Sequence, residues 1–416
     1  MTKLDNETQN DGQSRYDLVI AGGGYVGLSL ALAIKQASDL SILVVEPQPR
    51  ATMRCDERAS AIASGATKML GQLGVWDEIL PHAEPIQDMV VTDSKLQDIV
   101  RPVLLTFEGN TEEGVAFAHM IPNGIMVGAL ADAAKAAGVD LIEQDTVRDF
   151  VEEGSSVEVT LGSGRVLRAG LLVAADGVRS RLRDLAGIPV VRFDYDQMGI
   201  VTTVEHERPH EGRAVEHFLP SGPFAILPLK GNRSSLVWNE RTDDAKWLLA
   251  MDDFTFSLEL ERRFGKQLGA VVEKGPRKGF PLGMVLARSY VSPRFALIGD
   301  AAHGIHPIAG QGLNLGFKDV AALAEVIVEA ARLGQDIGAL DVLERYQTWR
   351  RFDVVQMGMT CDLLNRLFSN KSDILRHVRD LGLGLVERLP GLKAMFIEEA
   401  AGNSGDIPRL LRGEGL

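Results

Sequence analysis

Residues 295–323, FALIGDAAHGIHPIAGQGLNLGFKDVAAL, carry the clearest structural signal in this chain. It begins with the apolar run Phe295–Ile298, which is typical of a buried strand, and continues through Gly299 and Asp300 into a helix rich in small residues. A carboxylate at the end of a strand can bind sugar hydroxyls, and the glycines after it let backbone N–H groups approach a planar ring closely. The pattern favours a flavin as the ligand.

A second glycine-rich segment, GGGYVG at residues 22–27, follows the short apolar strand DLVIA at residues 17–21. Between a strand and a helix, Gly22 would make the tight turn and Gly24 would let a pyrophosphate lie against the backbone. Gly27 would bring the helix close to the strand. Such a motif alone is as often a plain turn as a binding site, so its neighbours decide.

The neighbouring elements complete a dinucleotide-binding pattern. A helix is predicted over Tyr25–Ala37, followed by a second strand over Ser41–Val45. Glu46 ends this strand, where its carboxylate would bind the hydroxyls of an adenosine ribose. Strand, helix and acid occur in the order that such a site needs, and we predict dinucleotide binding.

A third segment, LLVAADGVRSRLR at residues 171–183, is again an apolar strand, here closed by Asp176 and Gly177. An isolated Asp-Gly pair usually marks a reverse turn. The three segments together, however, resemble the flavin monooxygenases of the para-hydroxybenzoate hydroxylase type, and more closely the ubiquinone-biosynthesis hydroxylases within that group. The resemblance covers nearly the whole chain, and residues 306–319, HPIAGQGLNLGFKD, are its most specific part.

The resemblance implies roles for several residues. At the Asp300 position, the related enzymes bond the ribityl chain of the flavin. Asp176 and Gly177 are implied to lie along the cofactor, near the path of the pyridine nucleotide. Pro307 is implied to pack close to the flavin where oxygen reacts.

The helix that starts at Gly310, Gln311 and Gly312 suits a reduced flavin. Reduction places negative charge on the pyrimidine side of the ring, and N–H groups at a helix N-terminus stabilise such charge. Arg58, expected at the start of a helix over Ala59–Leu73, would neutralise the pyrophosphate, and the alternative is an ordinary exposed arginine. The predicted cofactor-binding residues are Gly22, Gly24, Gly27, Glu46, Arg58, Asp176, Gly177, Gly299, Asp300, Gly310, Gln311, Gly312 and Asn314. Those predicted around the reacting ring are Pro307, Gly310 and Gln311, and no catalytic base is assigned.

The composition suits a large enzyme: 416 residues can bury a substantial core, and the net charge is −13. An acidic chain argues against a nucleic-acid partner, because binding phosphates requires a basic face. Two cysteines, Cys55 and Cys361, are too few for a disulfide scaffold and indicate a reducing cytoplasm. The polar residues 1–15 show no secretory signal and are expected to be disordered, and no apolar run is long enough to span a bilayer.

His303 and His306 form an H-x-x-H pair. No acidic or cysteine third ligand stands near them in the sequence, so we predict no metal site. One of them could carry a proton, although a histidine held by backbone hydrogen bonds is the commoner case.

We predict an α/β fold: a Rossmann-like FAD-binding domain with an inserted antiparallel-sheet domain that covers the substrate, and a C-terminal helical region. The boundaries are residues 16–192 and 287–333 for the FAD-binding domain, 193–286 for the substrate-covering domain and 334–416 for the helical region. Further helices are expected over Ile125–Ala137, Leu313–Leu333, Val342–Phe368 and Ile374–Glu399. Strands are expected over Thr146–Val151, Val157–Leu161, Gly199–Val204, Ala214–Leu219, Phe224–Pro228 and Ser234–Trp238.

The resemblance implies an FAD-dependent monooxygenase that hydroxylates an aromatic ring. Reduced FAD would bind dioxygen as a C4a-hydroperoxide, which attacks an electron-rich phenol. The implied substrate is a polyprenyl phenol on the way to ubiquinone. No second glycine fingerprint follows a strand, so NAD(P)H or another donor would dock only transiently.

Two other functions fit the same pattern. The scaffold could serve a flavin-dependent reductase or epoxidase that acts on an isoprenoid. It could also be a flavin-loaded but silent partner in a quinone-biosynthesis complex. Flavin reduction by NAD(P)H that is stimulated by a phenol and followed by oxygen uptake would separate the hydroxylase from both.

A basic, leucine-rich segment near the C-terminus bears on where a lipid-soluble substrate is found. Residues 345–393 carry nine Lys or Arg against five Asp or Glu. Apolar residues of this segment share one helix face, which could pack on its own domain or lie against an anionic membrane or a membrane-associated partner. These residues are Leu363, Leu364, Leu367, Phe368, Leu381, Leu385, Leu389 and Leu392.

Overall fold

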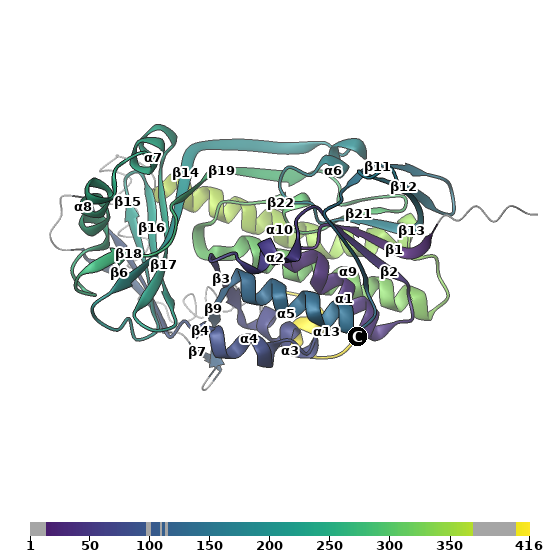
Figure 1. The fold of residues 1–416 in the computed structure, drawn as a ribbon, viewed down its shortest axis with the longest axis horizontal. Helices are drawn as coiled ribbons and strands as arrows, with labels where there is room; N and C mark the ends of the chain where they lie inside the picture. Colours follow the sequence, from purple (N-terminus) through teal and green to yellow (C-terminus); the bar gives the residue numbers. More distant parts are fainter. Residues whose placement is uncertain (1–13, 97–100, 109, 113–114, 369–404) are drawn as a thin grey trace, which may run out of the picture.

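The computed structural model describes residues 14–96, 101–108, 110–112, 115–368 and 405–416. These residues form two large sheets with helices packed along them (Figure 1). The disorder predicted for residues 1–15 falls almost entirely outside the described residues, and so does the helix expected over Ile374–Glu399. Among the helices that the structure describes, none is both long and apolar enough to cross a membrane.

The first sheet has eight strands with a parallel centre, as the continuous apolar runs of the sequence predict. Its strands are β1 (Arg15–Ala21), β2 (Ile42–Glu46), β10 (Asp140–Glu143), β11 (Val147–Glu152), β12 (Val157–Leu161), β13 (Val166–Ala174), β20 (Val291–Ser292) and β21 (Phe295–Leu297). The order is β10-β2-β1-β13-β12-β11, and β21 lies beside β13. All three segments of the predicted site therefore end at one edge of this sheet, since β1, β2, β13 and β21 run parallel.

Helices cover this sheet and bury its apolar residues. They include α1 (Tyr25–Ala37), α5 (Asn123–Ala136) and α9 (Gln311–Arg332), and α10 (Leu340–Phe368) packs on α9. Helix α1 lies between α5 and α9 (Figure 1) and is apolar around most of its circumference, which explains why most of it is buried. The shorter helices are α2 (Arg50–Arg54), α3 (Ser64–Gln72), α4 (Trp76–Ile79), α6 (Arg181–Leu185) and α13 (Arg409–Arg412).

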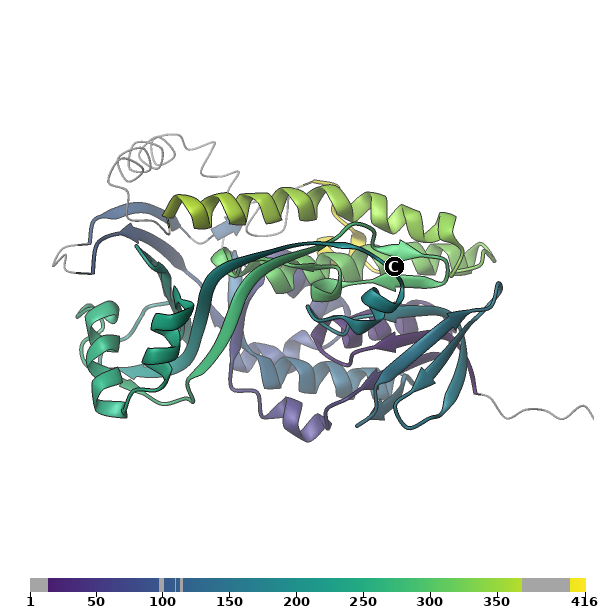
Figure 2. The same ribbon diagram turned by 90° about the horizontal axis from the view of Figure 1, so that it is seen from above.

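The second sheet has nine strands and reaches beyond residues 193–286. Its strands are β5 (Asp88–Asp93), β6 (Val103–Glu108), β14 (Val190–His206), β15 (Arg213–Leu219), β16 (Gly222–Leu229), β17 (Arg233–Arg241), β18 (Val271–Glu273), β19 (Lys278–Ala287) and β22 (His303–Gly304). The order is β22-β19-β14-β17-β16-β15-β5-β6, with β18 beside β14. Pairing is antiparallel except between β5 and β15, which are parallel. Strand β14 is much longer than the expected Gly199–Val204, and with β19 it extends from the rest of the second sheet towards the first sheet (Figure 2).

Alternation of side chains gives this sheet two different faces. One face packs on two helices that the sequence analysis did not predict, α7 (Thr242–Leu249) and α8 (Asp253–Phe264). Phe224 and Trp238 from the sheet meet Phe256 from α8 there. The other face, which carries Ala225 and Val237, lines a cavity described below.

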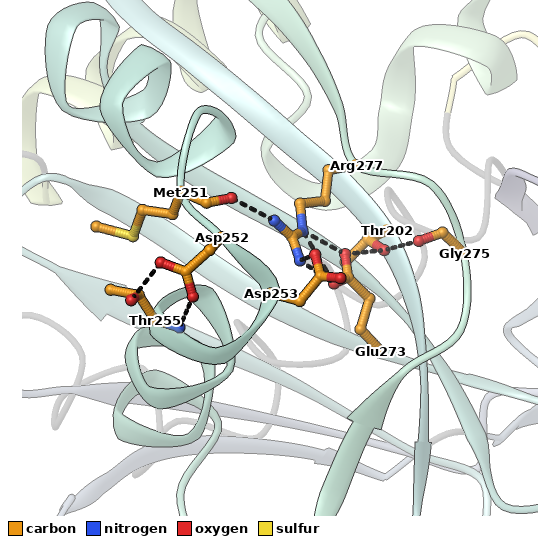
Figure 3. Close-up of polar contacts among 8 residues, drawn as sticks. All are labelled: Thr202, Met251, Asp252, Asp253, Thr255, Glu273, Gly275 and Arg277. Carbon is orange, nitrogen blue, oxygen red and sulfur yellow. Dashed lines mark hydrogen bonds and ion pairs between the residues drawn. The ribbon is translucent and has the colours of Figure 1, made fainter.

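Arg277 ties the two helices to the sheet (Figure 3). Its Nε lies 2.8 and 2.9 Å from the two carboxylate oxygens of Glu273, and its Nη1 donates to the carbonyl of Met251 at 3.1 Å. It also pairs with Asp253 at 2.7 Å, at the start of α8. Glu273 in turn accepts from the hydroxyl of Thr202 on β14 at 3.3 Å. These contacts hold the helices on the face that is turned away from the cavity.

The helix predicted over Ala59–Leu73 is wrong in its first part. Residues Ala59–Ala63 form strand β3, which pairs antiparallel with β9 (Ala118–Pro122), and the helix begins only at Ser64. A partner strand far along the chain overrides the local helical preference of this alanine-containing run. Arg58 therefore precedes a strand and not a helix. The remaining short strands are β4 (Glu84–Pro85), β7 (Asn110–Glu112) and β8 (Val115–Ala116).

The end of α10 selects between the two alternatives for three residues of the leucine-rich segment. Phe368 is buried, and its ring centroid lies 3.9 Å from that of Phe218 on β15. Leu364 and Leu367 pack on the same cluster. These three residues therefore pack on their own protein and do not face a membrane. The leucines predicted beyond them fall within residues 369–404, which lie outside the described residues.

Candidate active site

The turn between β1 and α1 accepts only glycine at two positions. Gly22 has a φ of +114°, and a Cβ there would lie 2.3 Å from the carbonyl oxygen of Ala175. A Cβ on Gly27 would lie 1.9 Å from the carbonyl oxygen of Gly22, whereas one on Gly24 would meet nothing within 4 Å. Gly24 is also the N-cap of α1, and no side chain caps the helix. The first backbone N–H groups of α1 can therefore bind a ligand in the open space beside Gly24.

Glu46 lies beside this turn at the end of β2. Its Oε2 accepts a hydrogen bond from the backbone N–H of Gly23 at 2.7 Å, and its Oε1 accepts one from Gln48 at 2.9 Å. A carboxylate has about four lone-pair sites, so two remain for the hydroxyls of a ribose. The strand end thus presents a fixed acceptor where the sequence pattern predicts one.

Arg58 is held in place by Asp56. Its Nη2 lies 2.7 Å from Oδ2 of Asp56, and its Nε lies 2.9 Å from Oδ1. The hydroxyl of Tyr25 also donates to Asp56, at 3.4 Å. Burial raises the pKa of Asp56, but the hydrogen bonds and charge of Arg58 outweigh this, and the pKa lies below its usual value. Asp56 therefore fixes the guanidinium of Arg58, although 41% of the Arg58 side chain is exposed.

Asp300 follows β21 and is accessible from the cavity although protein surrounds much of it. Desolvation by these surroundings raises the pKa of its carboxyl. Gly299 before it has a φ of +59° and, with Gly316, lies against Val26 of α1. The close approach of these glycines brings α9 and α1 together beside the cavity that Asp300 lines.

His303 and His306 are both fully buried. His303 Nε2 lies 2.5 Å from Oδ2 of Asp319, whose Oδ1 accepts from Nε of Arg350 at 2.9 Å. A carboxylate, and not the backbone, therefore holds His303, whereas His306 Nδ1 accepts from the backbone N–H of Ile308 at 3.3 Å. In the part of the chain that the structure describes, no three His, Cys, Asp or Glu side chains are grouped to hold a metal ion.

The start of α9 forms another open helix end. Gly310 is its N-cap in the left-handed conformation, with a φ of +62° and no side-chain cap, and a Cβ on Gly312 would meet nothing within 4 Å. The Asn314 amide accepts from the N–H of Ala63 at 2.9 Å and donates to the carbonyl of Ala61 at 3.0 Å. The Asn314 side chain thus holds β3 against α9, so its part in a cofactor site would be to position this loop.

Two adjoining cavities, of about 640 and 610 Å³, bring the predicted residues together. We call them the dinucleotide cavity and the ring cavity. Both are lined by Gly24, Tyr25, Arg58, Ala175 and Gly177. The dinucleotide cavity is further lined by Gly22, Glu46 and Asp176, and the ring cavity by Gly27, Gly299, Asp300, Pro307, Gly310, Gln311, Gly312 and Asn314. Every predicted site residue therefore borders one of the two.

The groups around these cavities fit FAD. The uncapped helix end at Gly24 and the cation of Arg58 suit a pyrophosphate, and Glu46 suits the adenosine ribose. The carboxylate of Asp300, which lines the ring cavity, suits the hydroxyls of a ribityl chain. The second uncapped helix end at Gly310 suits the electron-rich side of a flavin ring.

Sequence reasoning missed two polar residues on the far wall of the ring cavity. Glu216 on β15 and Asn239 on β17 are 7% and 2% exposed, and both line the cavity. The only sequence signal is the run AVEHFL, where Glu216 shares one strand face with Ala214 and Phe218. A charged residue between apolar neighbours on one strand face is expected to be buried, but this pattern does not indicate which cavity the residue lines.

Known proteins resemble this chain along most of its length. Residues 15–357 match the family model of the FAD binding domain. The chain is 43% identical to the ubiquinone hydroxylase UbiL of Rhodospirillum rubrum, over 95% of this chain and 92% of that protein. It is 34% identical to the 3-demethoxyubiquinol 3-hydroxylase of Escherichia coli, over 93% and 98%. Among solved structures, p-nitrophenol 4-monooxygenase PnpA of Pseudomonas putida shares the fold, with a TM-score of 0.79 at 18% identity over 95% of this chain and 100% of that one.

Proposed function

The chain belongs to the ubiquinone-biosynthesis hydroxylases of the FAD binding domain family, which are FAD-dependent monooxygenases, and we propose that it hydroxylates the aromatic ring of a polyprenyl phenol. The observation that carries the proposal is the form of the ring cavity. Groups that suit a flavin line one side, and the face of the nine-stranded sheet on the other side is apolar apart from Glu216 and Asn239. Such a wall suits a phenol with an apolar tail better than a highly charged metabolite.

Residues 307–312, which lead into α9 and which we call the α9 loop, would orient the reacting ring. Pro307, Gly310 and Gln311 border the ring cavity, and N–H groups at the start of α9 would stabilise negative charge on a reduced flavin. Bound FAD would supply electrons and activated oxygen to the reaction. The apolar sheet wall would hold the phenol in contact and exclude water.

The proposed reductant is NAD(P)H, which would dock transiently. The proposal is supported by the single glycine fingerprint of the sequence, which FAD would occupy. The exposed Asp176, together with Gly177, borders the dinucleotide cavity and would lie near the incoming nicotinamide.

An anionic membrane surface or a quinone-biosynthesis complex is the proposed source of the substrate. The support is the positive charge of residues 345–393 on an acidic chain. We expect the protein to sediment with anionic vesicles at low salt and to be released at high salt. A variant with Arg376, Arg379, Arg388 and Lys393 changed to Gln should bind less. Equal and negligible binding by both proteins would leave delivery by a partner protein as the better account.

One experiment tests the activity. Purified yellow protein is mixed with NAD(P)H, isotopically labelled dioxygen and extracted quinone precursors, and products are identified by mass spectrometry. We expect phenol-stimulated flavin reduction, oxygen uptake and a product with one labelled oxygen on the aromatic ring. Label on the isoprenoid chain would indicate an epoxidase, reduction without labelled product a reductase, and no flavin reduction a silent partner.

A further inference from the structure

The wall of the ring cavity opposite the α9 loop is one face of the nine-stranded sheet. Apolar side chains such as Ala214 and Leu227 form most of it. Glu216 lies among them, and its neighbours in register on the adjacent strands are Val91 on β5 and Ala225 on β16. A carboxyl group in such surroundings is costly unless something binds it.

A second buried carboxyl of the same sheet, by contrast, has hydrogen-bond and ion-pair partners within the protein. Glu240 lies on the face that packs against α8 and is 4% exposed. It accepts from the indole N–H of Trp238 at 2.9 Å and pairs with Arg263 at 3.0 Å. No described residue brings a hydrogen bond or a countercharge to Glu216, and burial raises its pKa to about 7. Glu240 is satisfied within the fold, and Glu216 is not.

Asn239 supplies a second unsatisfied group on the same wall. Its Oδ1 is buried and finds no hydrogen-bond partner among the described residues. Buried polar groups in folded proteins are nearly always hydrogen-bonded, so two unsatisfied groups that line one cavity point to polar atoms of a ligand.

We propose that Glu216 accepts the hydrogen bond of the substrate's phenol hydroxyl and takes its proton during hydroxylation, with Asn239 as a second polar contact. This inference rests on the proposed function. The phenol O–H bond breaks, the proton passes to the carboxylate, and the electron pair stays on the phenol oxygen and enriches the ring. One oxygen atom of dioxygen then bonds to a ring carbon, and that carbon loses its hydrogen as a proton. The proton from the ring carbon ends on the new hydroxyl, and the other oxygen atom leaves as water, which takes two electrons and one proton from the nicotinamide donor and a second proton from solvent. Glu216 returns its proton to the product.

Few titratable groups of the described residues share the surroundings of Glu216. Asp93 lies one pair further along the same face of β5 and has a contact of its own. Arg58 and Tyr25 lie at the dinucleotide end of the cavity, and Asp300 follows β21. The strands β16 and β17 present only uncharged side chains to the cavity on either side of Asn239. A titration near neutral pH that disappears in Glu216→Gln would therefore be assigned to Glu216.

The kinetic test compares the native holoenzyme with Glu216→Gln, which keeps the volume but cannot take a proton. With ortho-prenylphenol as probe, kcat/KM of the native enzyme should rise tenfold per pH unit up to about pH 7 and then level off, because the carboxylate form is the active base. Glu216→Gln should lose this limb and about 10²–10⁴-fold in kcat/KM at pH 8, the usual contribution of a general base. A more acidic, ring-fluorinated prenylphenol should recover part of the loss. An unchanged pH limb in the variant would overturn the proposal.

Glu240→Gln is the matched control, because it removes the other buried carboxylate of the sheet. It should lower the melting temperature and leave the pH limb in place. FAD content and melting temperature are recorded for every variant, so that a folding defect is not mistaken for loss of the base. A limb lost in Glu240→Gln as well, at full FAD content, would contradict the assignment to Glu216.

A binding measurement keeps the inference separate from the proposed function. Flavin absorbance changes report binding of ortho-prenylphenol and of its methyl ether to the oxidised holoenzyme without turnover. The native protein should prefer the phenol at least tenfold, and Glu216→Leu should bind both alike. If this preference holds but no phenol is hydroxylated, the contact stands and the proposed function fails. If the native protein shows no preference, the contact itself is rejected.

Discussion

The two walls of the ring cavity are built by different means. The α9 loop is largely backbone, with glycines at residues 310 and 312 and a helix end that no side chain caps. The opposite wall consists of side chains that project from strands β5, β15, β16 and β17. A backbone wall fixes the geometry of a cofactor and tolerates few changes. A side-chain wall can be altered without moving the cofactor, so it is the wall that can set which phenol is accepted.

Gly27→Ala should have the largest effect. Helix α1 packs against α9, so the position of the backbone wall depends on the close packing of α1 on the first sheet. The new Cβ would lie 1.9 Å from the carbonyl oxygen of Gly22, and backbone cannot yield as a side chain can. We expect a loss of more than about 4 kcal/mol in stability, or no folded FAD-bound protein, measured by thermal unfolding and flavin content. Gly71→Ala, in α3 with nothing within 4 Å of the new Cβ, is the control and should be neutral or stabilising. If Gly27→Ala matched Gly71→Ala in stability and flavin content, the backbone must shift to relieve the predicted clash, and the prediction would be wrong.

Asp300→Ala should separate folding from cofactor binding. The carboxyl is accessible from the cavity, so the apoprotein should keep its melting temperature. FAD should lose a charge-assisted hydrogen bond, which weakens its binding by about 1.5–3 kcal/mol, or roughly 10- to 150-fold. Flavin titration of the apoprotein measures this. Full FAD occupancy after dialysis of the variant would remove Asp300 from the ribityl contact.

Glu46→Ala should weaken FAD by about 1–3 kcal/mol through the lost ribose contact. The variant also releases the N–H groups of Gly23 and Gln48, so part of the loss comes from the turn itself. Glu46→Gln keeps an acceptor and should recover part of the affinity in the same titration. An unchanged dissociation constant in Glu46→Ala would exclude the ribose contact.

Leu227→Ala should have the smallest effect and act only on the side-chain wall. FAD affinity should stay unchanged, while KM for a prenylphenol rises about tenfold through lost apolar contact. Steady-state kinetics alongside flavin titration measure both. A fall in FAD affinity comparable to that of Asp300→Ala would show that the two walls are not independent.

The same contrast explains what could be predicted from the sequence. The bounds of α1 and the positions of Gly22 and Asp300 are written in consecutive residues, and the structure confirms the helix and places these residues at one edge of the first sheet. Glu216 could not be assigned, because its environment is made by β5 and β16, and nothing near it in the sequence says which strands flank it. Ala59–Ala63 was predicted as a helix for the same reason, since its strand partner is distant.

Because β5 pairs with β15, the nascent chain must be extended well beyond β5 before this pair can form. Asp88 and Arg213 are neighbours in the sheet but 125 residues apart in the chain. At a synthesis rate of about 5–20 residues per second, β5 and β6 wait roughly 6–25 s for their partner strand to emerge. During that interval Val91 and Leu105, buried in the finished protein, lack Phe218 of β15, which packs with them in one apolar cluster. Slowed synthesis between these segments should therefore lengthen the period in which the chain depends on chaperones.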